Sequence, residues 1–86
     1  MAILEITLVN KTVKLDTISY NLAEARSVKA LASTAAEWVN EKVMRHGCYC
    51  DLTELDMRKC IVIAATDNTV QQLSVCGINI NISVKL

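Results

Sequence analysis

The chain has 86 residues, which is enough for one domain but too few for two separate hydrophobic cores. Nine basic and nine acidic residues cancel to a net charge of zero, so no overall field would draw the chain to nucleic acid or to an acidic membrane. Hydrophobic residues make up 52% of the chain and aromatic residues 3%, with two Gly and neither Phe nor Pro. We therefore expect one domain over residues 1–86 with an aliphatic core, and no direct binding to nucleic acid or membranes.

The first twenty residues predict a β-hairpin. Apolar and polar residues alternate over 3–9 and again over 12–20, and Asn10-Lys11 lies between the two segments. Asn is one of the few residues other than Gly that tolerate a positive φ, which suits a two-residue turn. The register that this turn sets pairs Val9 with Thr12, places Glu5 opposite Asp16, and gives the hairpin one apolar face. That face comprises Leu4, Ile6, Leu8, Val13 and Leu15.

A long helix is predicted from Leu22 to Arg45. Asn21 followed by Glu24 resembles a capping pair at its start, and Gly47 suits its end. At 100° per residue the apolar side chains fall on one stripe. The stripe comprises Val28, Leu31, Ala32, Ala35, Ala36, Val39 and Val43, with Trp38 at its edge.

The second half of the chain predicts strands around one short element. We expect a strand over 48–55, a central strand over 59–66 that is buried on both faces, and a final strand over 78–85 in which Ile and Val alternate with polar residues. Residues 68–76 fit a short helix or a loop, because Thr69 and Gln72 resemble another capping pair and Gly77 would end a helix.

These elements predict a two-layer α+β domain, with an antiparallel sheet of about five strands and one long helix packed across it. If 68–76 is helical, the order from the second strand onward is β-α-β-β-α-β, which is ferredoxin-like with an extra N-terminal strand. The start of the chain lacks the basic region of a signal peptide, and no apolar run reaches the roughly 18 to 20 residues of a membrane span. We therefore expect a cytoplasmic protein with reduced thiols.

No set of residues predicts catalysis. His46 is the only histidine available as a base for a cysteine nucleophile, and two glycines cannot supply phosphate-binding loops or oxyanion turns. We expect no enzymatic activity and no cofactor. One alternative stays open, because His46, Cys48, Cys50 and Cys60 meet the ligand count of a zinc site but not its usual spacing. That alternative is a small zinc-stabilised or nucleic-acid-binding regulator.

The candidate interaction residues come from the helix and from the final strand. Trp is enriched at interfaces, and the polar side of the final strand carries little charge that would prevent pairing with a partner's sheet or with a second copy of the chain. The candidates are Arg26, Lys29, Glu37, Trp38, Asn79 and Asn81.

The segment from Thr17 to Ala25, continuing to Ala35-Ala36-Glu37-Trp38, is a predicted strand that leads into an Ala-rich helix with a late Trp. In this and in its size the chain resembles small phage-encoded anti-defence proteins, including anti-CRISPR proteins. The resemblance implies a non-enzymatic inhibitor that binds a bacterial defence complex of the CRISPR-Cas type in the host cytoplasm and blocks its activity. Because these proteins share no common motif, the resemblance transfers no functional residue.

Overall fold

The computed structural model describes residues 2–86, which form a four-stranded sheet and two α-helices in the order ββααββ. The elements are β1 (Ile3–Asn10), β2 (Val13–Asn21), the 3₁₀ turn η1 (Leu22–Glu24), α1 (Val28–Arg45), α2 (Glu54–Asp67), β3 (Gln71–Val75) and β4 (Ile78–Lys85). None of the helices in the described part is long and apolar enough to cross a membrane.

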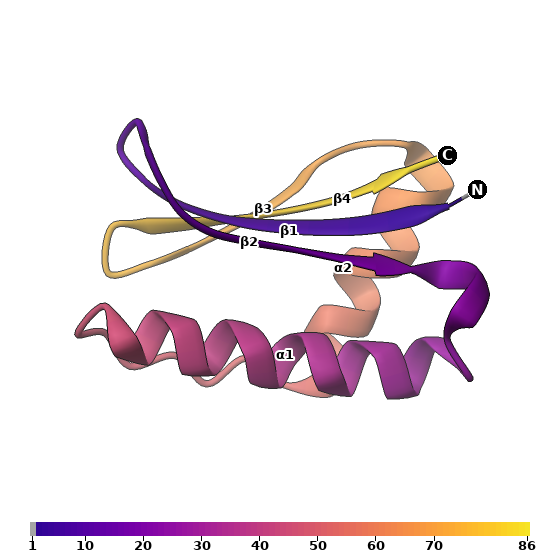
Figure 1. The fold of residues 1–86 in the computed structure, drawn as a ribbon, viewed down its shortest axis with the longest axis horizontal. Coiled ribbons are helices and arrows are strands. Elements are labelled where there is room, and N and C mark those ends of the chain that lie inside the picture. The colour runs from indigo at the N-terminus through magenta and orange to yellow at the C-terminus, as the bar shows by residue number, and fades with distance from the viewer. Residues whose placement is uncertain (1) are drawn as a thin grey trace.

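The sheet has the strand order β2-β1-β4-β3, and every neighbouring pair is antiparallel. The first and last strands are therefore the two central ones, and the edges are β2 and β3 (Figure 1). The final strand has no free edge for pairing with a partner, because β4 is hydrogen-bonded to β1 on one side and to β3 on the other.

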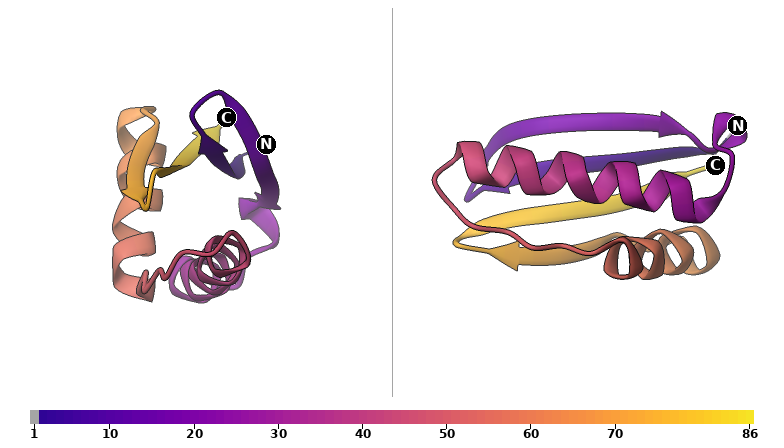
Figure 2. Two further views of the ribbon diagram at one scale, coloured as in Figure 1. Left: turned by 90° about the vertical axis from the view of Figure 1, so that its left-hand side faces the viewer. Right: turned by 90° about the horizontal axis from the view of Figure 1, so that it is seen from below.

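Both helices cover the same face of the sheet. In Figure 1, α1 lies along the strands below β1 and β2, and in the left view of Figure 2 α2 runs across the direction of α1 beside β3 and β4. The core between these layers is aliphatic, as the composition predicts, and burial of each large aliphatic side chain contributes about 1.5 to 3 kcal/mol. Its fully buried large side chains are Leu4, Ile6, Leu8, Met57, Ile80, Ile82, Val39 and Val43.

The β1–β2 hairpin forms, but its predicted register is wrong. The turn lies one residue later, at Lys11-Thr12, with Asn10 opposite Val13, and Lys11 takes the positive φ of 57°. An irregularity beside Leu8 then shifts the pairing again, so that Ile6 faces Ile18 and Glu5 faces Ser19. Leu4, Ile6 and Leu8 are buried as predicted and Leu15 packs against the core, whereas Val13 is exposed, because it pairs with the exposed Asn10 next to the turn, at the end of the hairpin.

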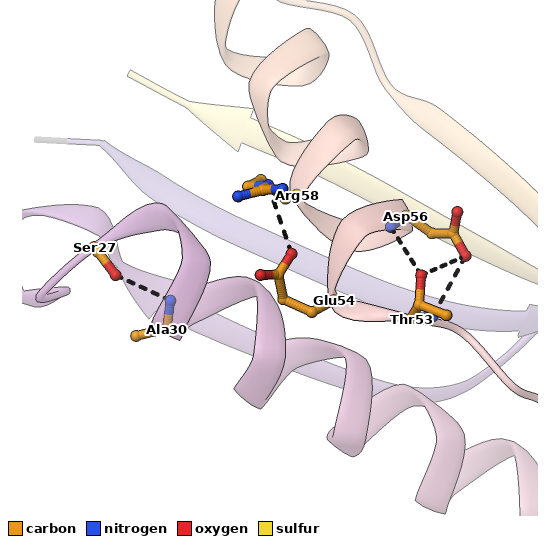
Figure 3. Close-up of polar contacts among 6 residues, drawn as sticks. All are labelled: Ser27, Ala30, Thr53, Glu54, Asp56 and Arg58. Atoms are coloured by element: carbon orange, nitrogen blue, oxygen red, sulfur yellow. Dashed lines mark hydrogen bonds and ion pairs between the residues drawn. The ribbon is translucent and has the colours of Figure 1, made fainter.

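The long helix begins later than predicted. Asn21 does cap a helix, but only the short turn η1, and α1 starts at Val28 with Ser27 as its cap. The Ser27 hydroxyl accepts a hydrogen bond from the Ala30 amide at 3.0 Å (Figure 3). The predicted stripe is buried from Leu31 to Val43, and Gly47 follows the helix end with a φ of +82°.

The two predicted strands over 48–55 and 59–66 are wrong, because most of this stretch is helix α2. Thr53 and Asp56 form a reciprocal capping box: the Thr53 hydroxyl accepts from the Asp56 amide at 3.1 Å, and the Asp56 carboxylate accepts from the Thr53 amide at 3.4 Å (Figure 3). Before α2, the Asn40 side chain both donates to and accepts from the Leu52 backbone at 2.9 Å. This pair of bonds holds the linker against α1 instead of in a sheet.

Residues 68–76 contain a strand and not the predicted helix or loop. Asn68, in the left-handed region, ends α2, and β3 then pairs with β4 around the two-residue turn Cys76-Gly77. Both turn residues have positive φ, 51° and 79°, as a type I′ hairpin requires. The two-layer α+β class is thus confirmed, while the five-stranded sheet and the ferredoxin-like order are wrong.

Candidate interaction surface

The six predicted interaction residues lie on two different surfaces. Arg26 and Lys29 are exposed at the start of α1, and Glu37 and Trp38 lie further along the same helix. Asn79 and Asn81 alternate with the buried isoleucines of β4, so they lie on the sheet face that neither helix covers. The structure therefore separates the helical residues from the two asparagines, and it does not gather the helical residues into one patch, because Lys29 and Trp38 are nine residues apart and lie on opposite sides of α1.

The uncovered sheet face is polar, and its side chains hydrogen-bond to one another. Gln72 of β3 donates to the Asn81 side chain at 3.0 Å, and Thr17 of β2 donates to Thr7 of β1 at 3.4 Å. Thr7 and Asn81 are direct neighbours across β1 and β4. These bonds across the strands use part of the hydrogen-bonding capacity of this face within the sheet itself.

Trp38 is half-buried and packs against the core. Its position at the border of the apolar stripe follows the sequence prediction that the ring lies at the edge of the core. A ring that already covers core side chains offers less free surface to a partner than a fully exposed one.

The four candidate zinc ligands do not form one site. The His46 Nε2 lies 3.0 Å from the Asp16 carboxylate, and the Cys48 thiol lies 3.9 Å from the Cys76 carbonyl oxygen, while Cys60 is on α2. Across residues 2–86, no three His, Cys, Asp or Glu side chains lie close enough to share one metal ion.

The chemistry of these thiols also disfavours metal binding. A hydrogen bond with the Cys76 side chain, together with burial, raises the pKa of Cys48, and burial is the main cause that raises the pKa of Cys50 and Cys60. A thiol must lose its proton to bind a metal, so a raised pKa weakens it as a ligand.

A concave surface with an apolar lining lies where the start of α1 meets α2. This groove, the α1–α2 groove below, has a volume of about 400 Å³. Its apolar lining comprises Leu22, Ala25, Val28, Leu31, Ile61, Val62 and Ala65, and Ser27 and Thr66 add hydroxyl groups. Val28 and Val62 are 43% and 48% exposed, so their apolar surface is open to a ligand.

A second apolar area continues from Val62 around the outside of α2. Leu55, Val62 and Ile63 are all more than 40% exposed, while Met57, Ile61 and Ala64 on the opposite side of the helix are buried. Arg58, Lys59, Val62 and Ile63 line a shallow hollow of about 260 Å³ on this side. Helix α2 therefore has one apolar face in the core and another in solvent.

The sequence does not reveal this surface, because a buried strand and a helix with two apolar faces both give a continuous run of apolar residues. The segment from Cys60 to Ala65 is continuously apolar, and three consecutive β-branched residues favour a strand. The signal that identifies the helix is the Thr53-x-x-Asp56 pair, a variant of the Ser/Thr-x-x-Glu capping box.

Comparison with known proteins gives no relative for this chain: no protein-family model matches it, and no curated protein and no solved structure is significantly similar to it.

Proposed function

We propose that this chain is a non-enzymatic protein-interaction module that receives an apolar segment of a partner protein in the α1–α2 groove. The observation that carries the proposal is the exposure of apolar side chains from two helices around one concavity, Val28 from α1 and Val62 and Ala65 from α2. Exposed apolar surface of this kind is typical of binding sites, because water contact with it is unfavourable until a partner covers it.

The size of the groove supports a segment of protein as its ligand. Ligand pockets in proteins commonly measure about 300 to 1,000 Å³, so the α1–α2 groove, at about 400 Å³, lies within that range and can receive apolar side chains of a partner. An amphipathic helix presents such side chains at positions i, i+3 and i+4. Its backbone polar groups are already satisfied within the helix, so burial in an apolar groove costs little.

Charge near the groove favours a partner segment with acidic residues. Arg26 and Lys29 are exposed beside Val28 and make no ion pair within residues 2–86. They lie at the N-terminal end of α1, where the helix dipole is also positive. The partner that fits best is thus an apolar helical segment with Asp or Glu at its ends.

A library of helical peptides tests this binding directly. Peptides with apolar i, i+3 and i+4 positions and acidic ends are selected against the immobilised protein, and the affinity of the selected peptides is remeasured on two variants. Val28→Asp places a charge in the groove, whereas Val13→Asp makes the same change at a comparably exposed valine in the β1–β2 hairpin, away from the groove.

We expect Val28→Asp to weaken peptide binding about tenfold or more, because it removes apolar contact and repels acidic ends. Val13→Asp should leave the affinity unchanged. Equal affinities for the two variants, or a library that yields no binder, would contradict the proposed site.

For the identity of the partner we propose a bacterial defence complex of the CRISPR-Cas type, inhibited in the cytoplasm of a phage-infected host. Support comes from the size of the chain and its Ala-rich helix, which resemble those of anti-defence proteins. The test is to express the wild-type chain and its variants in bacterial strains that each carry one defence complex, and then to challenge the strains with phage. Wild type and Val13→Asp should raise plaque counts in one strain and Val28→Asp should not; plaque counts that never rise would refute the inhibitor function but not the groove.

A further inference from the structure

The outer face of α2 carries a pattern of charge that the groove does not use. We define the outer stripe as Leu55, Lys59, Val62, Ile63 and Asp67, which are all exposed. Residues four apart lie on the same side of a helix, so Lys59, Ile63 and Asp67 follow one another along the stripe. The stripe therefore has an apolar centre with a positive charge before it and a negative charge after it.

Neither charge of the stripe is neutralised within the fold. Lys59 and Asp67 make no ion pair among residues 2–86, whereas the neighbouring Arg58 lies 3.5 Å from Glu54. Asp67 also lies at the C-terminal end of α2, where the helix dipole is negative, and the last turn holds no basic residue. An acidic residue is unfavourable there unless a cation from outside the chain approaches it.

We propose that the outer stripe binds a second copy of this chain, so that two α2 helices pack antiparallel around a two-fold axis next to Ile63. A two-fold axis requires a self-complementary surface, in which residue i of one copy meets residue j of the other and j meets i. Lys59 and Asp67 are each four residues from Ile63, so this axis places Lys59 of each copy near Asp67 of the other. Val62 and Ile63 of both copies then cover one another.

The charge arrangement selects the antiparallel orientation. Parallel packing in register would place Lys59 beside Lys59 and Asp67 beside Asp67, which is unfavourable. In the antiparallel pair both contacts join opposite charges, and the dipoles of the two helices also oppose each other.

This dimer adds to the proposed function without depending on it. Val62 belongs to both surfaces, so a peptide in the α1–α2 groove and the second copy share this side chain, while Val28 lies outside the stripe and Ile63 lies outside the groove. One stripe of a 14-residue helix covers less than the roughly 800 Å² per partner of a standard interface, so we expect a weak dimer.

Sedimentation equilibrium of the full chain tests the proposal, over protein concentrations from about 1 μM to 1 mM. We expect the wild-type mass to rise from monomer to dimer within this range. Ile63→Asp should keep the chain monomeric throughout, and Val13→Asp, the matched control on the hairpin, should dimerise like wild type. A wild type that remains a monomer, or an Ile63→Asp variant that dimerises like wild type, would overturn the proposal.

Charge reversals test the orientation. Lys59→Asp alone makes both contacts acidic, and Asp67→Lys alone makes both basic, so each variant should dimerise on the order of tenfold more weakly than wild type. An equimolar mixture of the two variants restores opposite charges at both contacts and should dimerise like wild type at low salt. A mixture no stronger than either variant alone would overturn the antiparallel arrangement.

Two variants distinguish a failure of the proposed dimer from a failure of the proposed groove. Val28→Asp should dimerise normally because its side chain is outside the stripe, and Ile63→Asp should still bind the selected peptides because it does not line the groove. Should the dimer form through the edges of β2 or β3 instead, it would survive Ile63→Asp, which contradicts the proposal.

Discussion

The two helices of this fold use their apolar residues in different ways. Helix α1 buries one stripe of mainly small side chains, and the middle of its opposite side is polar. Helix α2 buries Met57, Ile61 and Ala64 but also exposes Leu55, Val62 and Ile63. The first helix is an ordinary amphipathic helix, and the second has more apolar surface than the fold itself covers.

This difference locates the binding capacity of the molecule. Apolar side chains that are largely exposed add little to the stability of an isolated domain, and a stretch of them on one element marks an interaction surface. The outer side of α2 and the groove beside α1 form one such stretch, whereas the uncovered sheet face is polar and internally hydrogen-bonded. We therefore expect substitutions on α2 to separate folding from binding.

The largest expected effect on the free energy of unfolding comes from Ile→Ala substitutions at two positions of α2, one buried and one exposed. Ile61 is 2% exposed and Ile63 is 42% exposed, although both lie in the same turn. Ile61→Ala removes buried apolar groups and leaves a cavity, so it should lower the free energy of unfolding by about 2 to 4 kcal/mol, measured by urea denaturation. Ile63→Ala should lower it by less than about 1 kcal/mol. Equal losses would show that both faces of α2 serve the fold.

The caps of the two helices give the next effect. Thr53→Ala removes the hydroxyl that accepts from the Asp56 amide and donates to the Asp56 carboxylate, and should cost about 1 to 2 kcal/mol, whereas Ser27→Ala removes one contact at α1 and should cost about 1 kcal/mol. Thermal unfolding followed by circular dichroism checks both variants. If Thr53→Ala left the melting temperature unchanged, the capping box would not be needed to form α2.

The β3–β4 turn, which follows α2, should allow a gain in stability. Cys76 has a φ of 51°, a conformation that costs most residues about 1 kcal/mol and that Asn adopts more easily. Cys76→Asn should therefore raise the free energy of unfolding by a few tenths to about 1 kcal/mol. A lower melting temperature for this variant would mean that the cysteine side chain itself stabilises the turn.

The smallest expected effect is a pH dependence that belongs to α2 and not to α1. Burial, with a smaller contribution from Asp56, raises the pKa of Cys60 above its ordinary value of 9.0. The folded state then binds the Cys60 proton more tightly than the unfolded state does. The stabilisation from this proton is complete below the ordinary pKa of 9.0 and is lost as the pH rises through the folded pKa. In urea denaturation, the free energy of unfolding of the wild type should fall above about pH 9, and it should fall less in Cys60→Ala. Equal decreases in the two proteins would exclude Cys60 as the source of the pH dependence.

Local patterns in the sequence predict part of this fold. Alternation identifies β1 and β4, and the helical period identifies the buried stripe of α1, because each of these elements has one apolar face and one polar face. Helix α2 does not follow that rule, so its continuous apolar run from Cys60 to Ala65 resembles a central strand. Strand β3 is missed for a separate reason: Gln71–Val75 is short, and Thr69 and Gln72 resemble a capping pair that favours a helix.

The candidate surface could not be predicted from sequence either. The groove joins Leu22 and Val28 to Ile61 and Val62, and their proximity depends on the packing of α1 against α2. The sequence does indicate Arg26 and Lys29, which lie within two residues of the groove residue Val28, but it provides no distance between the two helices.

The most direct test of the account measures the backbone amide resonances of the ¹⁵N-labelled chain by nuclear magnetic resonance, in a dilution series and then with a selected peptide. We predict that dilution shifts resonances of the outer face of α2, residues 55–67, and that the peptide shifts those around Val28 and Val62, while the sheet is unchanged. Shifts confined to the polar sheet face or to the edges β2 and β3, or no shift in either series, would contradict the claim that α2 carries the interaction surface.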